Sequence, residues 1–252
     1  MKSLRNAFTL AEVLVTLGII GVVAAMTLPT VIANVRYHEL KTQLKKTYSE
    51  LNQIAQKFYY DEGMSVPDYT YMGSGSSSNA IFRDFLPKQI TGFAKKNDWT
   101  HADVDDEHSS LTTMPYELYN LRGQKMTNIC DISGMYTDAA GRLYSWNDSP
   151  NKGDNGPIIC VDINGVKRPN TYGKDFFLFV FTVDGFVIPM GQEHKNNRRL
   201  AGNLSGNGVN IGPQYCSKTT GSFNTTCAYY ALREVSPEDE GNSYWKDFLG
   251  IK

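Results

Sequence analysis

The sequence predicts an α+β fold in which one long N-terminal helix packs its second half on a small antiparallel sheet. Residues 13–35 carry no charge and are mostly apolar, as a membrane-spanning helix requires. Apolar residues then continue at three- and four-residue steps as far as Phe58, which is typical of one helical face. From about residue 142 to residue 190 the pattern changes to short β-branched and aromatic runs separated by turn residues.

Length, charge and cysteine content limit the classes of function. A chain of 252 residues suggests one or two domains, and a net charge of −1 gives no electrostatic case for nucleic acid as a partner. None of the four cysteines forms a C-x-x-C pair, which argues against a zinc site or a thioredoxin-like motif. An even number of cysteines after a membrane segment favours an oxidising compartment and two disulfides, and four reduced thiols are the alternative. The cysteines are Cys130, Cys160, Cys216 and Cys227, for which three connectivities are possible.

The first 35 residues divide into a short basic leader and an apolar helix. The leader, residues 1–7, contains Lys2 and Arg5, and the transmembrane and assembly helix is expected to occupy residues 8–35. At about 1.5 Å rise per residue, the uncharged part spans roughly 35 Å, which is enough to cross the hydrocarbon core of a bilayer.

Glu12 lies near the start of this apolar stretch. A carboxylate at membrane depth costs about 2.5–3.5 kcal/mol on insertion scales, and such residues are usually functional. Cleavage after Ala7 would create a partner for it, because Phe8 would then carry a free α-amine. The alternative is that Glu12 lies at the membrane interface with its carboxylate in water.

The run Ala7-Phe8-Thr9-Leu10-Ala11-Glu12, followed by a long apolar helix, resembles the class III signal sequence of type IV pilins and type II secretion pseudopilins. The resemblance implies that a membrane aspartyl peptidase cuts before Phe8 and methylates the new N-terminus. It also implies that Glu12 pairs with the N-terminal amine of a neighbouring subunit and sets the register of a filament. Ala7 stands where the family usually has glycine. Pro29 stands where many members have a helix-bending proline, and its missing N–H predicts a kink or local melting.

The same resemblance implies a structural protein, not an enzyme: a subunit of a type IV pilus-like or type II secretion pseudopilus filament. The implied partners are prepilin peptidase, other pilin or pseudopilin subunits, an inner-membrane assembly platform and, before assembly, membrane lipid. The implied location is the bacterial inner membrane, which the chain crosses once, with its head in the periplasm or outside. After assembly, the chain would lie in a cell-surface or periplasmic filament. Basic residues lie on both sides of the span, so the positive-inside rule does not decide the orientation, whereas the cysteines favour an outside head. The sequence contains no G-x-S-x-G, P-loop or H-E-x-x-H motif.

A rival interpretation uses the same segment only for targeting. Val31-Ile32-Ala33 has the small-residue pattern of an ordinary signal peptidase site, and cleavage there would release a protein starting at Asn34. The apolar stretch is longer than the usual 7–15 residues of a signal peptide, and Glu12 interrupts it. The alternative function is therefore a single-pass anchored or secreted surface-binding protein.

The second half of the helix, residues 36–62, is expected to be amphipathic, and Gly63 and Pro67 are expected to end it. Residues 63–252 then form a globular head, with an antiparallel sheet of three or four strands at about 142–190 and a disulfide-closed C-terminal region at 216–252. The helical face that meets the head consists of Leu40, Leu44, Tyr48, Leu51, Ile54, Ala55 and Phe58.

Local signals predict several further elements of the head. A short helix is expected from Asn79 to Leu86, with Pro87 just past its end, and a strand within residues 112–121. Asp184-Gly185 lies between two apolar runs and predicts a hairpin with a two-residue turn. Side chains alternate along the strand before it, so only one of two sets faces the helix. These sets are Phe176, Leu178 and Val180, or Phe177, Phe179 and Phe181.

Residues 161–175 also resemble pseudopilin-type heads, many of which carry a D-x-N-G…P-N…G-x-D connection before a strand. Some major pseudopilins bind calcium in the head, and calcium prefers oxygen ligands such as those in this connection. The spacing is not that of an EF-hand loop, and Asp, Asn, Gly and Pro also build turns without an ion, so we expect turn chemistry and no cofactor, with calcium as the alternative. The ligands for calcium would be Asp162, Asn164, Asn170 and Asp175.

The resemblance also suggests how the cysteines pair. Pilin heads often end in a disulfide-closed loop, which implies a bond between Cys216 and Cys227 and leaves Cys130 to pair with Cys160. The acidic run at residues 101–108, which contains two histidines, is expected to be a solvated loop and not a metal site. Tyr244, Trp245 and Phe248 are expected to pack the C-terminal tail against the head.

Overall fold

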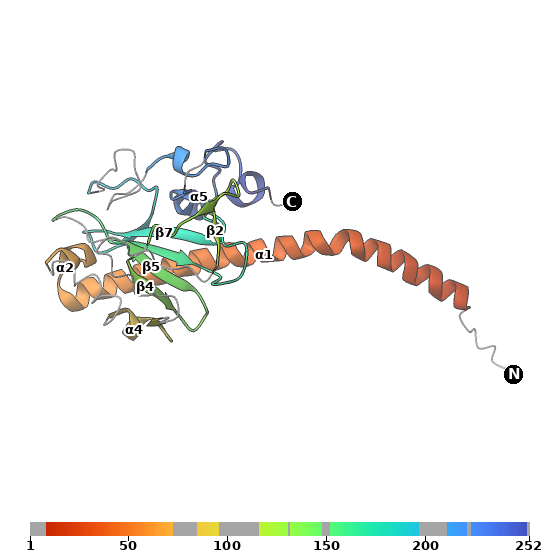
Figure 1. Ribbon diagram of the computed structural model, residues 1–252, viewed down its shortest axis with the longest axis horizontal. Helices are drawn as coiled ribbons and strands as arrows, with labels where there is room; N and C mark the ends of the chain where they lie inside the picture. The colour runs from red at the N-terminus through yellow and green to blue at the C-terminus, as the bar shows by residue number, and fades with distance from the viewer. Residues whose placement is uncertain are drawn as a thin grey trace, which may run out of the picture.

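The structure, a computed structural model, describes residues 9–72, 85–95, 116–130, 132–147, 152–196, 211–220 and 223–250. The leader with Ala7 and Phe8, the helix start expected at Asn79 and the acidic run at 101–108 lie outside the described residues. Figure 1 shows one long helix whose second half runs along a sheet while its first half extends away from the head. The predicted α+β fold, with a long N-terminal helix packed on an antiparallel sheet, is confirmed.

The long helix α1 runs from Leu10 to Glu62 without interruption. It ends at Gly63, which has φ +68° and a backbone N–H that donates to the Tyr59 carbonyl at 3.1 Å. Glycine tolerates this left-handed conformation because it has no Cβ, so the predicted C-terminal signal acts as expected. The remaining described helices are α2 Val66–Met72, α4 Leu86–Gln89, η3 Pro213–Tyr215, α5 Cys227–Arg233 and a π-helical turn, η4, at Tyr244–Phe248.

The main sheet has six antiparallel strands in the order β1-β4-β5-β6-β7-β8, so β4 to β8 form a meander in chain order. Four of these strands, β5 to β8, lie between residues 142 and 190, as expected, whereas β1 and β4 precede that range and extend the sheet at one edge beyond the prediction. A separate two-stranded sheet pairs β2 with β3. The strands are β1 Ala94–Lys95, β2 Leu118–Tyr119, β3 Lys125–Met126, β4 Ile132–Thr137, β5 Leu143–Asn147, β6 Ile158–Asp162, β7 Phe176–Phe181 and β8 Val187–Pro189.

Two local predictions need correction. Pro87 lies in the first turn of α4, where a proline removes no helical hydrogen bond, so helix continues beyond the expected end at Leu86. The Asp184-Gly185 hairpin exists, but its connection is longer than two residues because β7 already ends at Phe181. Gly185 has φ +80°, and a Cβ there would lie 2.9 Å from the ring of Tyr59 on α1, so this turn touches the long helix.

β7 is buried on both faces, and its two sets of side chains enter different cores. Phe177, Phe179 and Phe181 pack in the core that contains the buried face of α1. The other set, with Leu178 at its centre, packs in a second core on the far side of the sheet, with Cys130, Cys160 and Tyr172. The predicted helical face from Leu40 to Phe58 is buried in the first core, except that Tyr48 is half-buried and stacks on Phe179.

Candidate functional site

The first turn of α1 is closed by a reciprocal pair of hydrogen bonds between Thr9 and Glu12. The Glu12 backbone N–H donates to the Thr9 hydroxyl at 3.2 Å, while Oε2 of Glu12 accepts from the Thr9 backbone N–H at 2.8 Å and from its hydroxyl at 2.9 Å. This capping box satisfies donors that a helix start leaves free. The prediction for Glu12 overlooked Thr9, although the spacing Thr-x-x-Glu before an apolar run is the sequence signature of such a cap.

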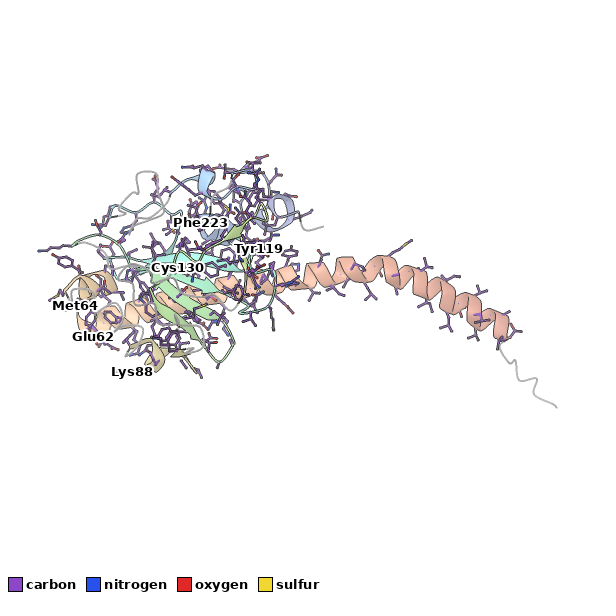
Figure 2. All side chains as sticks on the ribbon, viewed as in Figure 1. Glu62, Met64, Lys88, Tyr119, Cys130 and Phe223 are labelled. Atoms are coloured by element: carbon purple, nitrogen blue, oxygen red, sulfur yellow. A yellow bond between two sulfur atoms is a disulfide. The ribbon has the colours of Figure 1, made fainter. Side chains whose placement is uncertain are left out.

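The first half of α1 exposes apolar side chains on every side, and not along one stripe. Leu14 and Val15 are both about 60 % exposed, at 62 % and 60 %, and so are the adjacent Ile19 and Ile20, at 60 % and 62 %. Figure 2 shows side chains projecting from several sides of this half of the helix, which extends away from the head. Among the described residues, α1 is the one helix long and apolar enough to cross a membrane. A helix that is apolar all around needs lipid or other helices around it.

Pro29 lies inside α1, and the helix continues through it. The alternative of local melting at this residue is therefore not seen. Figure 1 shows α1 curving along the half that lies beyond the head. Because proline has no N–H and its ring crowds the preceding turn, a bend in this region has a direct local cause.

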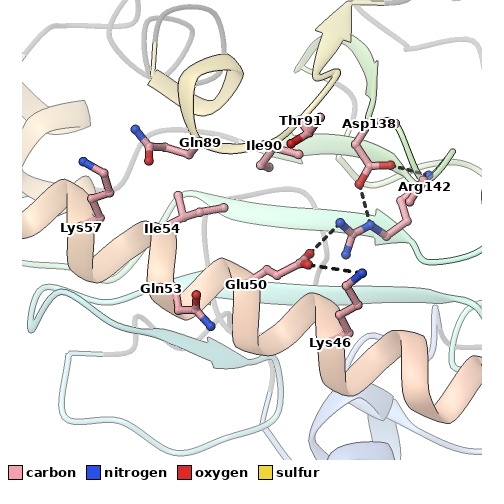
Figure 3. A pocket seen from close by; sticks show the side chains of 12 residues that line it. Lys46, Glu50, Gln53, Ile54, Lys57, Gln89, Ile90, Thr91, Asp138 and Arg142 are labelled. Atoms are coloured by element: carbon pink, nitrogen blue, oxygen red, sulfur yellow. Dashed lines mark hydrogen bonds and ion pairs between the residues drawn. The ribbon is translucent and has the colours of Figure 1, made fainter.

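The second half of α1 is tied to the sheet by a buried arginine. Arg142, which lies just before β5, donates from Nε to Oδ2 of Asp138 at 2.6 Å and from one terminal nitrogen to Oε2 of Glu50 on α1 at 2.6 Å. Its other terminal nitrogen donates to the Thr47 hydroxyl on α1 at 3.0 Å. Figure 3 shows the contacts of Arg142 with Asp138 and Glu50 along one wall of a cavity of about 420 Å³ between α1, α4 and the β4–β5 turn. Tyr144 also donates to Asp138, at 2.9 Å, so this acid is well satisfied.

A second polar contact joins α1 to the C-terminal region. Glu234, just after α5, accepts from Lys41 at 2.5 Å and from Lys45 at 2.6 Å. Hydrogen bonds from these two ammonium groups lower the pKa of Glu234. All three side chains are partly exposed, so the contact orients the elements more than it stabilises them.

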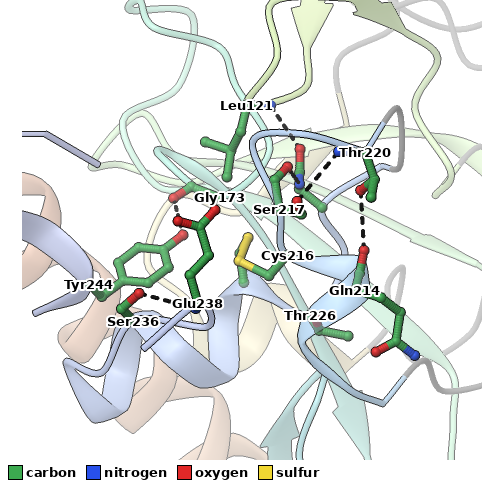
Figure 4. Close-up of a disulfide and its surroundings, with 12 residues drawn as sticks. Leu121, Gly173, Gln214, Cys216, Ser217, Thr220, Thr226, Ser236, Glu238 and Tyr244 are labelled. Atoms are coloured by element: carbon green, nitrogen blue, oxygen red, sulfur yellow. Dashed lines mark hydrogen bonds between the residues drawn. A yellow bond between two sulfur atoms is a disulfide. The ribbon is translucent and has the colours of Figure 1, made fainter. Parts of the chain in front are cut away.

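The structure joins Cys216 to Cys227 and Cys130 to Cys160, which is the pairing that the resemblance implied. The first bond closes a short loop before α5, with Cα atoms 4.9 Å apart. It lies close to Gly173, where a Cβ would come within 2.8 Å of the Cys227 sulfur, and Tyr244 donates to the Gly173 carbonyl at 2.6 Å (Figure 4). The disulfide, the C-terminal turn and the β6–β7 connection therefore pack at one place.

The second disulfide supports the sheet on the face away from α1. Cys160 lies in the middle of β6, opposite Leu178 of β7, and both cysteines are buried in the second core. The bond ties the segment after β3 to the central strands, with Cα atoms 6.0 Å apart. A disulfide stabilises mainly by constraining the unfolded chain, by about 2–4 kcal/mol.

The fold brings together the two acids of the β6–β7 connection. Asp162 ends β6, and its carboxylate accepts from the Asn164 backbone N–H at 3.2 Å and from the Tyr116 hydroxyl. Asp175 precedes β7, and its two oxygens accept from the backbone N–H groups of Asn170 at 2.7 Å and Thr171 at 2.6 Å. Burial raises the pKa of Asp175 to about 6, and burial together with the neighbouring charge of Asp175 raises that of Asp162 well above its ordinary value. The two carboxylates thus accept the hydrogen bonds that hold this connection in place, but they are buried near each other, which disfavours their charged forms.

The raised pKa values predict that the head loses stability as the pH rises from about 4 through the folded-state values. In this window the folded chain holds more protons than the unfolded chain, so the free energy of unfolding falls as the pH rises. Asp162→Asn mimics the protonated acid and should remove much of this slope. At pH 7.5 the variant should be more stable than the wild type by about 1–3 kcal/mol, and equal to it near pH 3.5. Urea unfolding of the full chain in detergent at several pH values measures this, with Asp61→Asn, an exposed acid on α1, as the control; a variant with the wild-type slope would contradict it.

The same four residues allow a direct comparison of turn chemistry with calcium binding. Every carboxylate oxygen of Asp162 and Asp175 already accepts a hydrogen bond from the chain, which is what a turn requires. The side-chain oxygens of Asn164 and Asn170 are buried without a hydrogen-bond partner and are the ones left to a cation. Among the described residues no group of three or more acidic, histidine or cysteine side chains is placed to hold a metal.

Calcium binding at this connection therefore stays a prediction of the resemblance, and we expect the turn to form without it. The melting temperature of the full chain should be the same in 1 mM calcium chloride and in excess chelator, because the acids already have donors in the chain. Differential scanning calorimetry in detergent measures this, and magnesium chloride controls for ionic strength. A calcium-dependent rise of several degrees that Asp162→Asn removes would establish the site.

The predicted residues do not form one site. Glu12 and Pro29 lie on the exposed half of α1, and the Cys130–Cys160 disulfide lies in the core away from α1. The Cys216–Cys227 disulfide packs against the β6–β7 connection that holds the acids. Arg142 and Glu234, which join α1 to the head, were not predicted. Their partners are distant in the chain, and no local spacing could have identified them.

Comparison with protein-family models identifies the N-terminal segment. Residues 2–28 match the model described as the prokaryotic N-terminal methylation motif, which is the signature of type IV pilin and pseudopilin precursors. Searches of curated proteins and of solved structures find no match. The motif points to a structural protein and not to an enzyme. It coincides with the leader and the exposed half of α1.

Proposed function

We propose that this chain, which carries the N-terminal motif of type IV pilin precursors, is a structural subunit of a type IV pilus-like or type II secretion pseudopilus filament. One observation carries the proposal: a single continuous helix is built into a folded head over its second half and exposes apolar side chains on all sides over its first half. Such a half-helix can exchange lipid for the helices of other subunits without unfolding the head.

The mechanism has no catalytic site and begins with processing. The basic leader holds the precursor at prepilin peptidase, which cuts between Ala7 and Phe8 and methylates the new amine. The chain then remains in the inner membrane by α1, with its head on the periplasmic or outer side, until an assembly platform moves it into the filament. Before this step its neighbours are lipids, and after it they are other pilin or pseudopilin subunits.

Glu12 then meets the Phe8 amine of a neighbouring subunit. In the capping box only Oε2 is used, and within the described residues Oε1 accepts no hydrogen bond. One carboxylate can therefore cap its own helix and still accept from an incoming ammonium group. Apolar packing between helices supplies most of the cohesion, while this charge pair selects the register because a misaligned acid would stay unpaired in an apolar bundle.

The N-terminus of the mature protein tests the proposal against its alternatives. We expect mass spectrometry of the chain from membranes of the native host to find Phe8 as the first residue, with an added methyl group. Ala7→Gly, which restores the usual residue of the motif, should be processed at least as completely. A first residue of Asn34 would instead establish a secreted surface-binding protein, and Met1 a plain single-pass anchor; either would contradict the proposal.

A further inference from the structure

A second cavity lies where α1 leaves the head. It has a volume of about 380 Å³ and is formed between one face of α1 and the π-helical turn η4 near the C-terminus. Figure 1 shows the C-terminal segment beside the point where the helix emerges. The residues that line the cavity include Asn34, Tyr37, His38 and Lys41 on α1, at helical spacing, and Trp245 and Lys246 on η4.

The lining of this junction cavity is cationic and aromatic, and it includes no carboxylate. Lys41 is already paired with Glu234. Within the described residues, the His38 ring and the Lys246 ammonium group have no hydrogen bond or ion pair, and both side chains are exposed. Trp245 is only 6 % exposed, and its indole N–H donates to the Ala231 carbonyl at 3.1 Å, so its ring forms a fixed wall.

The position of the cavity along α1 matches the level of lipid headgroups. Val35 is the last residue of the uncharged stretch and is 52 % exposed. At 1.5 Å rise per residue, Tyr37 lies about 3 Å and Lys41 about 9 Å farther along the axis than Val35. The headgroup region extends roughly 5–8 Å beyond the hydrocarbon core on each side. A helix that buries residues 13–35 in hydrocarbon therefore holds this cavity in the headgroup layer.

We propose that the junction cavity binds the phosphate of an anionic phospholipid from the leaflet that faces the head. Lys246 supplies charge and donors, the His38 ring supplies a further polar contact, and Tyr37 and Trp245 supply the amphipathic rings that favour membrane interfaces. The bound lipid fixes the depth and rotation of α1 before assembly, and it leaves when neighbouring subunits replace the bilayer. This inference rests on the membrane insertion of α1 in the proposed function.

Lipid retention by the full chain tests the site. The wild-type chain, purified in detergent, is incubated with equal amounts of phosphatidylglycerol and phosphatidylcholine, and native mass spectrometry counts the lipids that stay bound. We expect phosphatidylglycerol to be retained in preference. Lys246→Ala should lower this retention about fivefold, the effect of one cation at an anionic surface, and Lys246→Glu should lower it further. Lys88→Ala, an exposed lysine on α4, is the matched control and should retain lipid as the wild type does.

Three results would overturn the inference. The first is equal retention of the two lipids by the wild type, and the second is equal retention of phosphatidylglycerol by the Lys246 and Lys88 variants. The third is that inorganic phosphate at the same concentration competes as strongly as the lipid, since the ligand would then be free phosphate. Carbonate extraction of native membranes separates this inference from the proposed function. A chain that resists extraction but lacks lipid preference contradicts only the lipid site, whereas a chain that is extracted contradicts both.

Discussion

Replacing Glu12 by alanine should reduce incorporation into filaments at least tenfold and leave the head folded. Glu12 lies on the exposed half of α1, and its hydrogen bonds within the described residues go to Thr9, so the substitution removes nothing from either core. The variant loses the capping box, worth about 0.5–2 kcal/mol, and the charge that would meet the neighbouring amine. The amount of chain in sheared filaments, relative to the amount in membranes, measures incorporation.

Two further variants separate the cap from the charge. Glu12→Gln keeps a side chain that can close a capping box but has no charge, whereas Thr9→Val keeps the charge and removes the hydroxyl that caps the Glu12 backbone N–H. If the charge pair selects the register, Glu12→Gln should fail as Glu12→Ala does, while Thr9→Val should assemble. Assembly of Glu12→Gln at the wild-type level would show that the helix cap is what filaments need, and the proposed role of the charge pair would be wrong.

Among the polar contacts between α1 and the head, replacing Arg142 by alanine should cause the largest loss in the free energy of unfolding, about 3–5 kcal/mol. The arginine side chain is only 9 % exposed, and that of Asp138 is 2 % exposed. Without the guanidinium group, Asp138 stays buried with only neutral donors, from the Tyr144 hydroxyl and a backbone N–H. The same change removes the bonds to Glu50 and Thr47, so α1 loses these polar contacts with the β4–β5 turn.

Paired substitutions distinguish two causes of this loss of stability: the buried Asp138 carboxylate left without a cationic partner, and the lost packing of the Arg142 side chain. Arg142→Met keeps most of the apolar volume and should still be strongly destabilised, and adding Asp138→Asn should recover part of the loss because no buried charge remains unpaired. Lys57→Ala is the control, since Lys57 and Asp61 form an exposed pair one turn apart that should contribute less than about 0.5 kcal/mol. Urea unfolding of the full chain in detergent measures the free energy of unfolding of the Arg142→Ala variant and of the three variants named here. A single Arg142→Met variant as stable as the wild type would show that the ion pairs do not hold α1 to the head.

Sequence patterns predicted correctly those elements whose conformation depends on residues close together in the chain. The long helix follows from uncharged residues 13–35 and the apolar repeat up to Phe58, and it ends at Gly63 because that position needs a left-handed backbone. The order β5, β6, β7 and β8 follows from short apolar runs with turns between them. The sheet extends beyond the predicted range through β4 and β1, and β1 has only two residues, which are too few to show a pattern.

The candidate sites divide in the same way. The processing motif around Glu12 is contiguous in the chain and could be read from the sequence, although its partner Thr9 was overlooked. Asp162 and Asp175 were singled out as a group because they flank one connection, but their mutual burial and raised pKa values depend on the strands that they join. The contacts of Arg142 and Glu234 with α1 join residues about 90–190 positions apart, and no spacing rule covers such pairs.

By itself, the sequence determined that the chain has an apolar N-terminal helix with one acid near its start, continued as an amphipathic helix, because charge, helical period and capping act within a few residues. Only the tertiary structure decided which face of β7 meets that helix. Both sets of alternating side chains are apolar, so strand period alone leaves the choice open. Phe177, Phe179 and Phe181 face α1 because the second disulfide and the β2–β3 sheet cover the opposite face, and that arrangement depends on residues far from β7 in the chain.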